Sequence, residues 1–428
     1  MSDKVVRLSR RRFLKTAAVS GALVAAPGLI PAKALGKDGA VAPSERILLG
    51  GIGIGGRGSY DLGCFLDEPE VHFTSICDVR ADRREGVKNR IDGKYGNKDC
   101  RMYRDFREFL DKSGVDAVLI TTGSNWHCLL SIYSAKAGKD VYCEKPCTKN
   151  IAESIALADV FRRTGRVFQG GMQRRSLPHM EFAIELAHGG KLGKLTTVYA
   201  HPGGLGTHTS GWGQGEADPP KEQIDWDLFL GSAAWRPFNR GLLSSEFEKG
   251  GGMVGGGNLE WGSHCVDLCQ WAAEADDTAP VEYFPIEKDG TASARYANGV
   301  KLVLRNNGWL PLGSCPVRFE GEKGWVETGD TAKLMLSSPA LLSGKKVQEI
   351  GGYPANFHIR NFLDCVKSRG MPRVNYQVAA QSHIACHASN IAIFLNRALK
   401  YDPVKNEFIG DDEANRLRSE AIRDPWHV

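Results

Sequence analysis

A glycine-rich turn directly after an apolar run most restricts how this chain can fold. The run 47–52 is followed by Gly53, Gly55 and Gly58, in the spacing G-x-G-x-x-G. Where a strand turns into a helix, these glycines permit a tight turn, close approach of a pyrophosphate, and close packing of the helix on the strand. Because the helix N-terminus also supplies free N–H groups and a favourable dipole, the pattern predicts a dinucleotide site at the start of a parallel sheet.

A second apolar run, Val71–Asp78, ends in a carboxylate 20 residues after Gly58. At this distance an acidic side chain typically bonds the adenosine ribose hydroxyls. The charge of Asp78 repels a 2′-phosphate and favours NAD, whereas Arg80 would accommodate that phosphate and keeps NADP as the alternative. A competing interpretation is that Asp78 only caps the helix expected from Ala81.

Two further strands are expected, Ala117–Thr122 and Asp140–Cys143, each separated from its neighbours by helical segments. Strands that alternate with helices imply right-handed crossovers, a parallel sheet, and ligands at the carboxyl ends of the strands. The run 140–143 leads directly into Lys145, which therefore lies at the edge where a nicotinamide would bind. We expect a Rossmann domain with a doubly wound parallel sheet over residues 44–166.

The second half of the chain has a different pattern, with apolar runs that follow one another without helical crossovers. The expected strands are 166–169, 195–200, 281–287, 291–296, 300–305, 316–320 and 324–328. Asn298-Gly299 is a strong signal for a two-residue hairpin. Residues 167–428 are therefore expected to form an α+β domain with a large, mostly antiparallel open β-sheet. Because an exposed sheet face commonly pairs, we expect a homo-oligomer.

The connection 201–257 is long, rich in glycine and contains tryptophans beside charged residues, in Asp225-Trp226-Asp227 and Trp235-Arg236-Pro237. Connections of this length inside a compact domain are usually functional or disordered. Aromatic faces with neighbouring carboxylates and arginines suit sugar rings, so Trp235 and Arg236 are candidate substrate contacts. The alternative is that these tryptophans are simply part of the core.

The first 34 residues have the pattern of an export signal. Ser9-Arg10-Arg11-Arg12-Phe13-Leu14-Lys15 matches a twin-arginine motif, a short apolar stretch follows, and Ala32-Lys33-Ala34 is a small-x-small cleavage site. The stretch is too short for a membrane anchor. We expect a periplasmic or otherwise exported protein with no membrane association once the signal is removed. Since that compartment offers no free nicotinamide pool, the nucleotide should be tightly held and its redox cycle closed.

Composition excludes several other classes of function. The formal charge of +5 is small, and no basic block with interleaved aromatics appears beyond the leader, so no nucleic-acid partner is expected. The eleven cysteines are an odd number, lie within core segments and form no C-x-x-C. We expect buried thiols rather than disulfides, with Cys143 and Cys147 as a metal or redox pair the weaker alternative. No metal centre is predicted.

The segment Leu259–Trp271 is expected to be a helix whose inward face carries Glu260, His264 and Asp267, at i, i+4 and i+7. A buried histidine between two carboxylates is a candidate general base whose tautomer is oriented by an acidic group. A hydrogen-bonded core histidine is the alternative. The glycines at 250–257 just upstream favour a site, because they allow close approach of chain and ligand.

With these motifs in hand, the chain resembles the Gfo/Idh/MocA oxidoreductase family over residues 44–428. The resemblance is carried by Gly53-Ile54-Gly55-Gly56-Arg57-Gly58, Thr121-Thr122 through Trp126-His127, Glu144-Lys145-Pro146 and the Glu260…His264…Asp267 segment; Asp225-Trp226-Asp227 and Asp424-Pro425-Trp426 resemble its secreted bacterial members. It implies that Lys145 bonds the substrate hydroxyl and the nicotinamide ribose. His264 would take the hydroxyl proton while hydride passes to the nicotinamide.

The chain departs from the family at two places. The family's dehydrogenases usually have Asp where this chain has Glu260, and the NAD-dependent glycosidases usually follow their histidine with Gly-x-Gly-Pro, where this chain has Cys265-Val266-Asp267-Leu268. Three functions are therefore considered. They are an NAD(P)-dependent oxidoreductase acting on a sugar, polyol or glycoside; a redox-neutral glycoside-cleaving enzyme; and a non-catalytic nucleotide- or sugar-binding protein.

The expected site residues fall into three groups. Catalytic roles are expected for Lys145, His264, Glu260 and Asp267. Cofactor contacts are expected from Gly53, Gly55, Gly56, Arg57, Gly58, Asp78, Arg80, Thr122, Trp126, His127, Glu144, Lys145 and Gln173. Substrate contacts are expected from Lys145, Arg174, Trp235, Arg236 and His264. For His127 a structural capping role is the alternative, and for Arg174 a surface charge.

Overall fold

A computed structural model describes residues 41–205, 214–243, 257–306 and 311–427; the expected signal peptide, 1–34, lies outside these ranges. Residues up to Arg46 form a unit of their own, in which Pro43–Glu45 is a single 3₁₀ turn. The second unit begins at Ile47 and contains both sheets.

The first sheet is built from short apolar runs that are mostly buried on both faces, the pattern of a parallel sheet covered by helices. Its strands are β1 (Ile47–Ile52), β2 (Val71–Cys77), β3 (Arg101–Tyr103), β4 (Ala117–Ile120), β5 (Asp140–Cys143) and β6 (Phe168–Gly170). They pair in parallel in the order β3-β2-β1-β4-β5-β6. The predicted doubly wound sheet is confirmed. Only β3 went unpredicted, because this short edge strand has two exposed residues.

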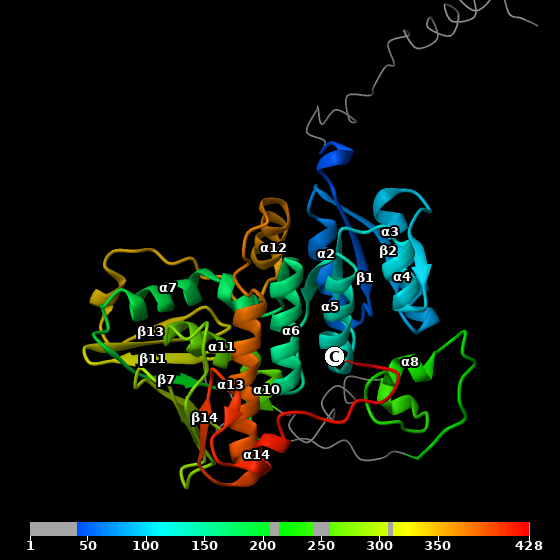
Figure 1. The fold of residues 1–428 in the computed structure, drawn as a ribbon. Coiled ribbons are helices and arrows are strands. Elements are labelled where there is room, and N and C mark those ends of the chain that lie inside the picture. The colour runs from blue at the N-terminus through cyan, green and yellow to red at the C-terminus, as the bar shows by residue number, and fades with distance from the viewer. Residues whose placement is uncertain (1–40, 206–213, 244–256, 307–310, 428) are drawn as a thin grey trace, which may run out of the picture. The chain divides into compact units, whose positions relative to one another are not determined.

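Helices cover both faces of this sheet (Figure 1). One face is covered by α2 (Gly56–Leu66) and α3 (Ala81–Tyr95), joined by α12 (Asn356–Ser368), and the other by α4 (Phe106–Lys112), α5 (Ser124–Lys136) and α6 (Ile151–Thr164). The strand order reverses between β1 and β4. In open α/β sheets, ligands bind outside the carboxyl ends of the strands at such a reversal.

The second sheet has nine strands in the order β13-β12-β11-β7-β10-β9-β8-β14-β15. They are β7 (Leu195–Ala200), β8 (Glu282–Phe284), β9 (Ala292–Arg295), β10 (Lys301–Leu304), β11 (Val317–Gly321), β12 (Gly324–Thr328), β13 (Leu334–Leu336), β14 (Leu399–Asp402) and β15 (Glu407–Phe408). The pair β7–β10 is parallel and the other pairs are antiparallel. The predicted mostly antiparallel sheet is confirmed.

Three helices bury one face of the second sheet and form its core. They are α7 (Pro178–His188), α11 (Gly262–Ala272) and α13 (Tyr376–Leu395). On the opposite face Tyr199, Arg318 and Trp325 remain partly exposed. The guanidinium of Arg318 stacks on the ring of Trp325, 3.9 Å from its centroid. The sheet is therefore covered by helices on one face.

The hairpin at Asn298-Gly299 forms, but its loop is longer than predicted. Tyr296 N–H bonds Val300 O, and Gly299 N–H bonds Tyr296 O, so residues 297–299 make a three-residue loop. Gly299 has φ +90°, the left-handed position that closes such a loop. A two-residue loop would instead need positive φ at both central residues, which Asn298 does not adopt.

The helix predicted over Leu259–Trp271 is interrupted at Trp261. A short helix α10 (Gly257–Glu260) ends there and α11 begins at Gly262. A Cβ added at Gly262 would lie 2.9 Å from Asn258 Oδ1 and 3.3 Å from the thiol of Cys386 on α13. The interruption thus occurs where the chain packs tightly against α13, a contact that helical periodicity does not report.

All eleven cysteines are buried and none is in a disulfide, which confirms the prediction of core thiols. No helix in the described part of the chain has the length and apolar character needed to cross a membrane.

Candidate dinucleotide and substrate site

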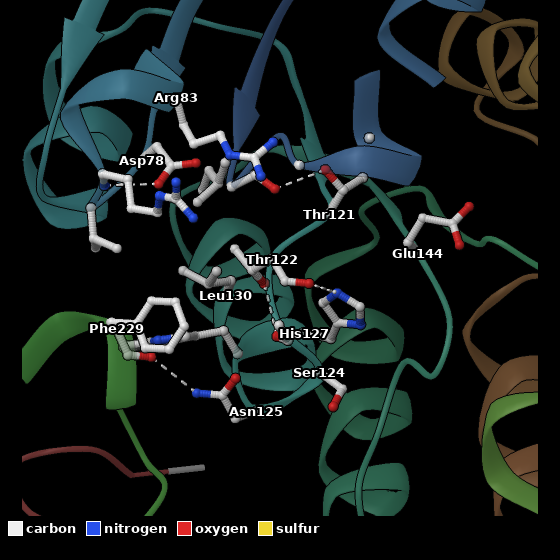
Figure 2. A pocket seen from close by; sticks show the side chains of 18 of the residues that line it. Asp78, Arg83, Thr121, Thr122, Ser124, Asn125, His127, Leu130, Glu144 and Phe229 are labelled. Atoms are coloured by element: carbon white, nitrogen blue, oxygen red, sulfur yellow. Dashed lines mark hydrogen bonds between the residues drawn. The ribbon is translucent and has the colours of Figure 1, made fainter. Parts of the chain in front are cut away.

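A cavity of about 410 Å³ lies at the carboxyl ends of β1, β2, β4 and β5. Its lining includes every residue predicted to contact the cofactor except Gln173, together with Glu260. Figure 2 shows Asp78 and Glu144 on opposite sides of the view, with Thr122 and His127 between them. The cavity therefore connects the predicted ribose position with the predicted catalytic lysine.

The glycine fingerprint has the local geometry that a dinucleotide requires. A Cβ added at Gly55 or Gly56 would meet nothing within 4 Å, so these two glycines leave the cavity open beside the start of α2. A Cβ at Gly58 would instead collide with the Thr121 hydroxyl. Gly58 thus permits helix–strand contact, while Gly55 and Gly56 form an open cradle that fits a pyrophosphate.

At the ribose end, the Asp78 carboxyl is buried and accepts the Arg80 backbone N–H at 2.9 Å. Burial raises its pKa to about 6, and the nearby arginines oppose the rise. The Arg80 side chain turns to Asp82, with Nη2 2.6 Å from Oδ2. Arg83, which the sequence analysis missed, also lines the cavity (Figure 2). Asp78 thus both lines the cavity and supports the start of α3.

At the opposite end, the Lys145 ammonium lies 3.0 Å from Glu260 Oε2 and 5.6 Å from the centroid of the Trp261 ring. The extra methylene of a glutamate lets this carboxylate reach Lys145 from the end of α10. Both side chains are about one-fifth exposed. This pair holds the Lys145 ammonium at the edge of the cavity. Its two members are 115 residues apart in sequence.

Glu144 points away from Lys145 and organises the floor of the site. Its carboxylate accepts the Lys145 backbone N–H at 3.2 Å, lies 3.4 Å from Arg57 Nε, and accepts the side-chain amide of Gln173. Arg57 also pairs with the buried Asp61, Nη2 to Oδ1 at 3.0 Å. Arg57 therefore contacts two acidic side chains beside the glycine cradle, and Gln173 lies behind Glu144 rather than on the cavity wall.

His264 is buried near Lys145 but does not belong to the cavity lining. Burial lowers its pKa well below the usual value, and the positive charges of Arg174, Lys145 and Arg57 lower it further. It is therefore neutral at pH 7 and able to accept a proton. Its Nδ1 is buried without a hydrogen-bond partner among the described residues.

The Asp267 carboxylate is engaged by Arg175 and Ser382, and its predicted catalytic role stays a prediction. Both of its carboxylate oxygens bond the guanidinium of Arg175, with Oδ2 2.8 Å from Nε, and Oδ1 also accepts the Ser382 hydroxyl at 2.7 Å. Arg175 is buried too, and an unpaired buried cation would be costly. The carboxylate is taken up by this ion pair, which joins helices α11 and α13 to the segment after β6.

The other predicted substrate residues also lie outside the cavity lining. Arg174 is buried in a bidentate pair with Asp330, at 2.8 and 2.6 Å, so neither a surface charge nor a free cation describes it. Trp235 is 60% exposed, and Arg236 presents its carbonyl to the Trp226 indole. Arg174, Trp235 and Arg236, like His264, were predicted from residue type and local position, which do not report where a side chain is directed by long-range contacts.

His127 has the structural role considered for it, and it lies where the predicted cofactor contact would be made. Its Nδ1 lies 2.8 Å from Pro146 O and its Nε2 3.0 Å from Thr122 O, and it also lines the cavity. Burial lowers its pKa, while the two carbonyl contacts act in the opposite direction. It joins the loop after β4 to the loop after β5, which keeps the two sides of the cavity in register.

One wall of the cavity was missed entirely. It consists of Leu228, Phe229 and Leu243, from the connection predicted to be loop-rich. This connection contains a short helix α8 (Trp226–Leu230) whose N-cap is Asp225. Trp226 lies in a small core of its own with Leu230 and Phe238, which confirms the core interpretation for this tryptophan. The D-W-D run, with Asp before an aromatic, was the available signal for a capped helix.

Comparison with known proteins agrees with this architecture. The model for the oxidoreductase family NAD-binding Rossmann fold matches residues 47–172, and the model for the family's C-terminal alpha/beta domain matches residues 207–428. A glycosyl hydrolase family 109 protein of Saccharopolyspora erythraea is 31% identical over 173 residues, which is 37% of this chain and 38% of that protein. The myo-inositol 2-dehydrogenase of Thermotoga maritima is 29% identical over 146 residues, 34% of this chain and 42% of that protein.

Solved structures show the same fold at lower identity. The myo-inositol 2-dehydrogenase of Lactobacillus plantarum superposes with a TM-score of 0.59 at 18% identity, covering 83% of this chain and 100% of that chain. The aldose-aldose oxidoreductase of Caulobacter crescentus gives 0.58 at 19% identity, covering 83% and 99%. Together with the two family models, the open glycine cradle and the lysine–glutamate pair, these matches show that the chain belongs to the Gfo/Idh/MocA oxidoreductase family.

Proposed function

We propose that this protein is an NAD(P)-dependent oxidoreductase that transfers hydride between a tightly held nicotinamide nucleotide and a hydroxyl of a sugar, polyol or glycoside. The observation that carries the proposal is one continuous cavity, with the open cradle of Gly55 and Gly56 and the Asp78 carboxylate along it and the Lys145–Glu260 pair at its edge. A bound nicotinamide ring would supply the hydride acceptor or donor. The chain's own residues then have to bind the hydroxyl and move its proton.

In this proposal Lys145 donates a hydrogen bond to the reacting oxygen and stabilises the negative charge that develops on it. Glu260 holds the ammonium in place across the cavity edge, 3.0 Å away. His264, neutral because burial lowers its pKa, accepts the hydroxyl proton, and its unpartnered Nδ1 is the atom with free capacity. The neutral form of His264 is the one that a general base requires.

For the nucleotide we propose NAD rather than NADP. The Asp78 carboxyl lines the cavity at the ribose position, where its charge disfavours a 2′-phosphate. Arg80 is engaged by Asp82 and so is not free for a phosphate. Arg83, which also lines this end, is the residue through which NADP would bind if it were accepted.

The second candidate is redox-neutral cleavage of a glycoside, in which a ring hydroxyl is oxidised, the aglycone eliminated and the hydroxyl restored. The similarity to a glycosyl hydrolase family 109 protein favours it. The sequence Cys265-Val266-Asp267-Leu268 after the histidine, in place of Gly-x-Gly-Pro, counts against that subgroup. A purely nucleotide- or sugar-binding role is the third, and the neutral His264 beside Lys145 is a feature that such a role would not need.

Denaturing the purified protein and identifying the released nucleotide by mass would test the proposal first. Stoichiometric NAD(H) is the expected result, and an empty protein that binds no added nucleotide would contradict it. The loaded protein would then be offered free sugars, polyols and aryl glycosides. A net change in the oxidation state of the bound nucleotide after an alcohol is added would support the oxidoreductase. Release of the aglycone with no net change in that oxidation state would identify glycoside cleavage.

We also propose export through the twin-arginine pathway and self-association through the open face of the second sheet. The first is supported by the Arg-Arg motif at positions 10–12, in residues outside the described ranges, and the second by the partly exposed Tyr199 and Trp325. Fractionation of cells with the Arg10→Lys, Arg11→Lys variant tests export. The molar mass of the mature protein in solution tests association, and a monomer would contradict it.

A further inference from the structure

The connection 214–243 from the second half of the chain forms an outer wall of the dinucleotide cavity. We call it the strap. Its helix α8 supplies Leu228 and Phe229 to the cavity lining, and Leu243 at its end joins them. In the view of Figure 2, Phe229 lies on the same side as Asp78 and away from Glu144. The strap therefore faces the adenosine half of the cavity rather than the catalytic lysine.

The strap is attached to the Rossmann domain on both sides of the cavity. On the β2 side, the Ala81 N–H bonds Gln223 O at 2.9 Å and the Asp225 N–H bonds Val79 O at 3.1 Å. On the α5 side, the Trp126 indole donates to Leu228 O at 2.8 Å and the Asn125 amide donates to Leu230 O at 2.9 Å. The backbone of the strap would thus pass over a ligand in the cavity, with hydrogen bonds on the β2 side and on the α5 side.

The strap has a small core of its own. Trp226, Leu230 and Phe238 are buried against one another, with Trp226 stacked on Phe229 at 5.0 Å between ring centroids. Gly231 ends α8 with φ +54°, and a Cβ there would collide with the Trp126 ring. The attachment of α8 to α5 is therefore a close backbone-to-ring contact.

The C-terminal segment of the described chain contacts the strap (Figure 1). We call Arg423–Trp426 the latch. The Arg423 guanidinium bonds Gly231 O at 3.0 Å, Asp227 O at 2.9 Å and the Asp227 carboxylate at 2.6 Å. Trp426 packs edge-on against Trp126, 4.8 Å between ring centroids. One arginine thus satisfies the C-terminal end of α8, while the tryptophan anchors the tail to the helix beside the cavity.

We propose that the strap encloses the adenosine half of the bound dinucleotide and that the latch sets the rate at which the nucleotide leaves. This inference rests on the proposed function, since it requires a dinucleotide in the cavity. It supplies a structural cause for the tightly held nucleotide that was predicted from the leader alone. The latch reaches the cavity lining through the strap and through Trp426, which packs on Trp126 and Phe106, so it acts as a positioning element.

The test is the release of NADH from the full mature protein. Protein loaded with NADH is mixed with excess NAD⁺, and the loss of bound NADH fluorescence gives the dissociation rate constant. Arg423→Ala is expected to raise this constant at least tenfold, with a smaller change in the association rate constant. Asp227→Asn, which leaves the two carbonyl contacts in place, is expected to give a smaller increase.

Arg397→Ala is the matched control, because Arg397 pairs with Asp411 and Glu413, which both lie outside the strap. Arg397→Ala should leave the NADH dissociation rate constant unchanged, although its loss of thermal stability should be comparable to that of Arg423→Ala. Tight NADH binding with the same release rate in Arg423→Ala and wild type would overturn this inference alone. Failure of the wild-type protein to bind NADH or NADPH would overturn the proposed function and this inference with it.

Discussion

At the scale of single residues, the site depends on charges that are held by partners far away in sequence. Lys145 is fixed by Glu260, Arg174 by Asp330, and Arg175 by Asp267. The last two pairs are buried, where breaking a pair costs more than forming it gains. They stabilise the fold around the site, whereas only the first lies at the edge of the cavity.

Replacing Lys145 by alanine separates chemistry from nucleotide binding. Removing one preorganised donor to a developing negative charge typically lowers kcat by about 100- to 1,000-fold. We expect a loss of this size in Lys145→Ala, with nucleotide still bound, as measured by turnover and by equilibrium titration of the same preparation. Lys136→Ala, at the exposed end of α5, is the control, and undiminished turnover in Lys145→Ala would remove Lys145 from the mechanism.

The pH profile reports on His264. Its pKa lies well below the usual 6.5 because the ring is buried and surrounded by cations, and a general base works only in its neutral form. We expect kcat at saturating nucleotide to stay level as the pH falls through 6.5 and to decline only at lower pH. A decline centred at 6.5 would mean that His264 is solvated during turnover or is not the base.

At the scale of elements, two glycines of one motif have different tasks. Gly55 has φ −96° and opens into the cavity, whereas a side chain at Gly58 would collide with Thr121. We expect Gly55→Val to weaken nucleotide binding with little effect on the melting temperature of the nucleotide-free protein. Gly58→Val should lower that melting temperature, because overpacking costs about 1–3 kcal/mol. Equal effects of the two variants in both measurements would contradict this assignment.

Most strands of both sheets could be predicted from the sequence because the signal is local, whereas the short strands β3, β13, β14 and β15 were missed. A run such as Leu195–Ala200 carries its own β-propensity, and the glycine fingerprint lies within one turn. The interruption at Trp261 could not be predicted, since it reflects packing of Gly262 on α13, more than one hundred residues later. The same holds for Arg174 and Phe229, whose directions are set by long-range contacts.

At the scale of the whole molecule, buried histidines make the fold sensitive to acid. His383 accepts the Cys147 N–H at Nε2 and faces Ala379 O at Nδ1, so the ring has to be neutral. Burial lowers the pKa of His179, His358 and His383 to about 4 and that of His387 to about 3. An unfolded histidine titrates near 6.5. Between about pH 4 and pH 6.5 the unfolded state therefore binds more protons than the folded state.

The contribution of these histidines to stability should therefore be complete above pH 6.5 and decrease as the pH falls toward 4, by about 1.4 kcal/mol per pH unit for each such histidine. Asp61 and Asp78, with pKa values raised to about 9 and about 6, act in the opposite direction, but the lowered histidines outnumber them. Denaturant unfolding at a series of pH values measures this slope. A free energy of unfolding that stays constant from pH 6.5 to 4 would contradict it.

The burial of all eleven thiols has a chemical consequence for any journey out of a reducing compartment. In the folded protein no oxidant reaches these sulfurs, and their pairing is never in question. In an extended chain that met an oxidising environment, eleven thiols could form disulfides at random. No native disulfide would stabilise one pairing over the others. A chain of this composition is protected only if it is already folded on arrival, which is the mode of transport that its Arg-Arg motif predicts.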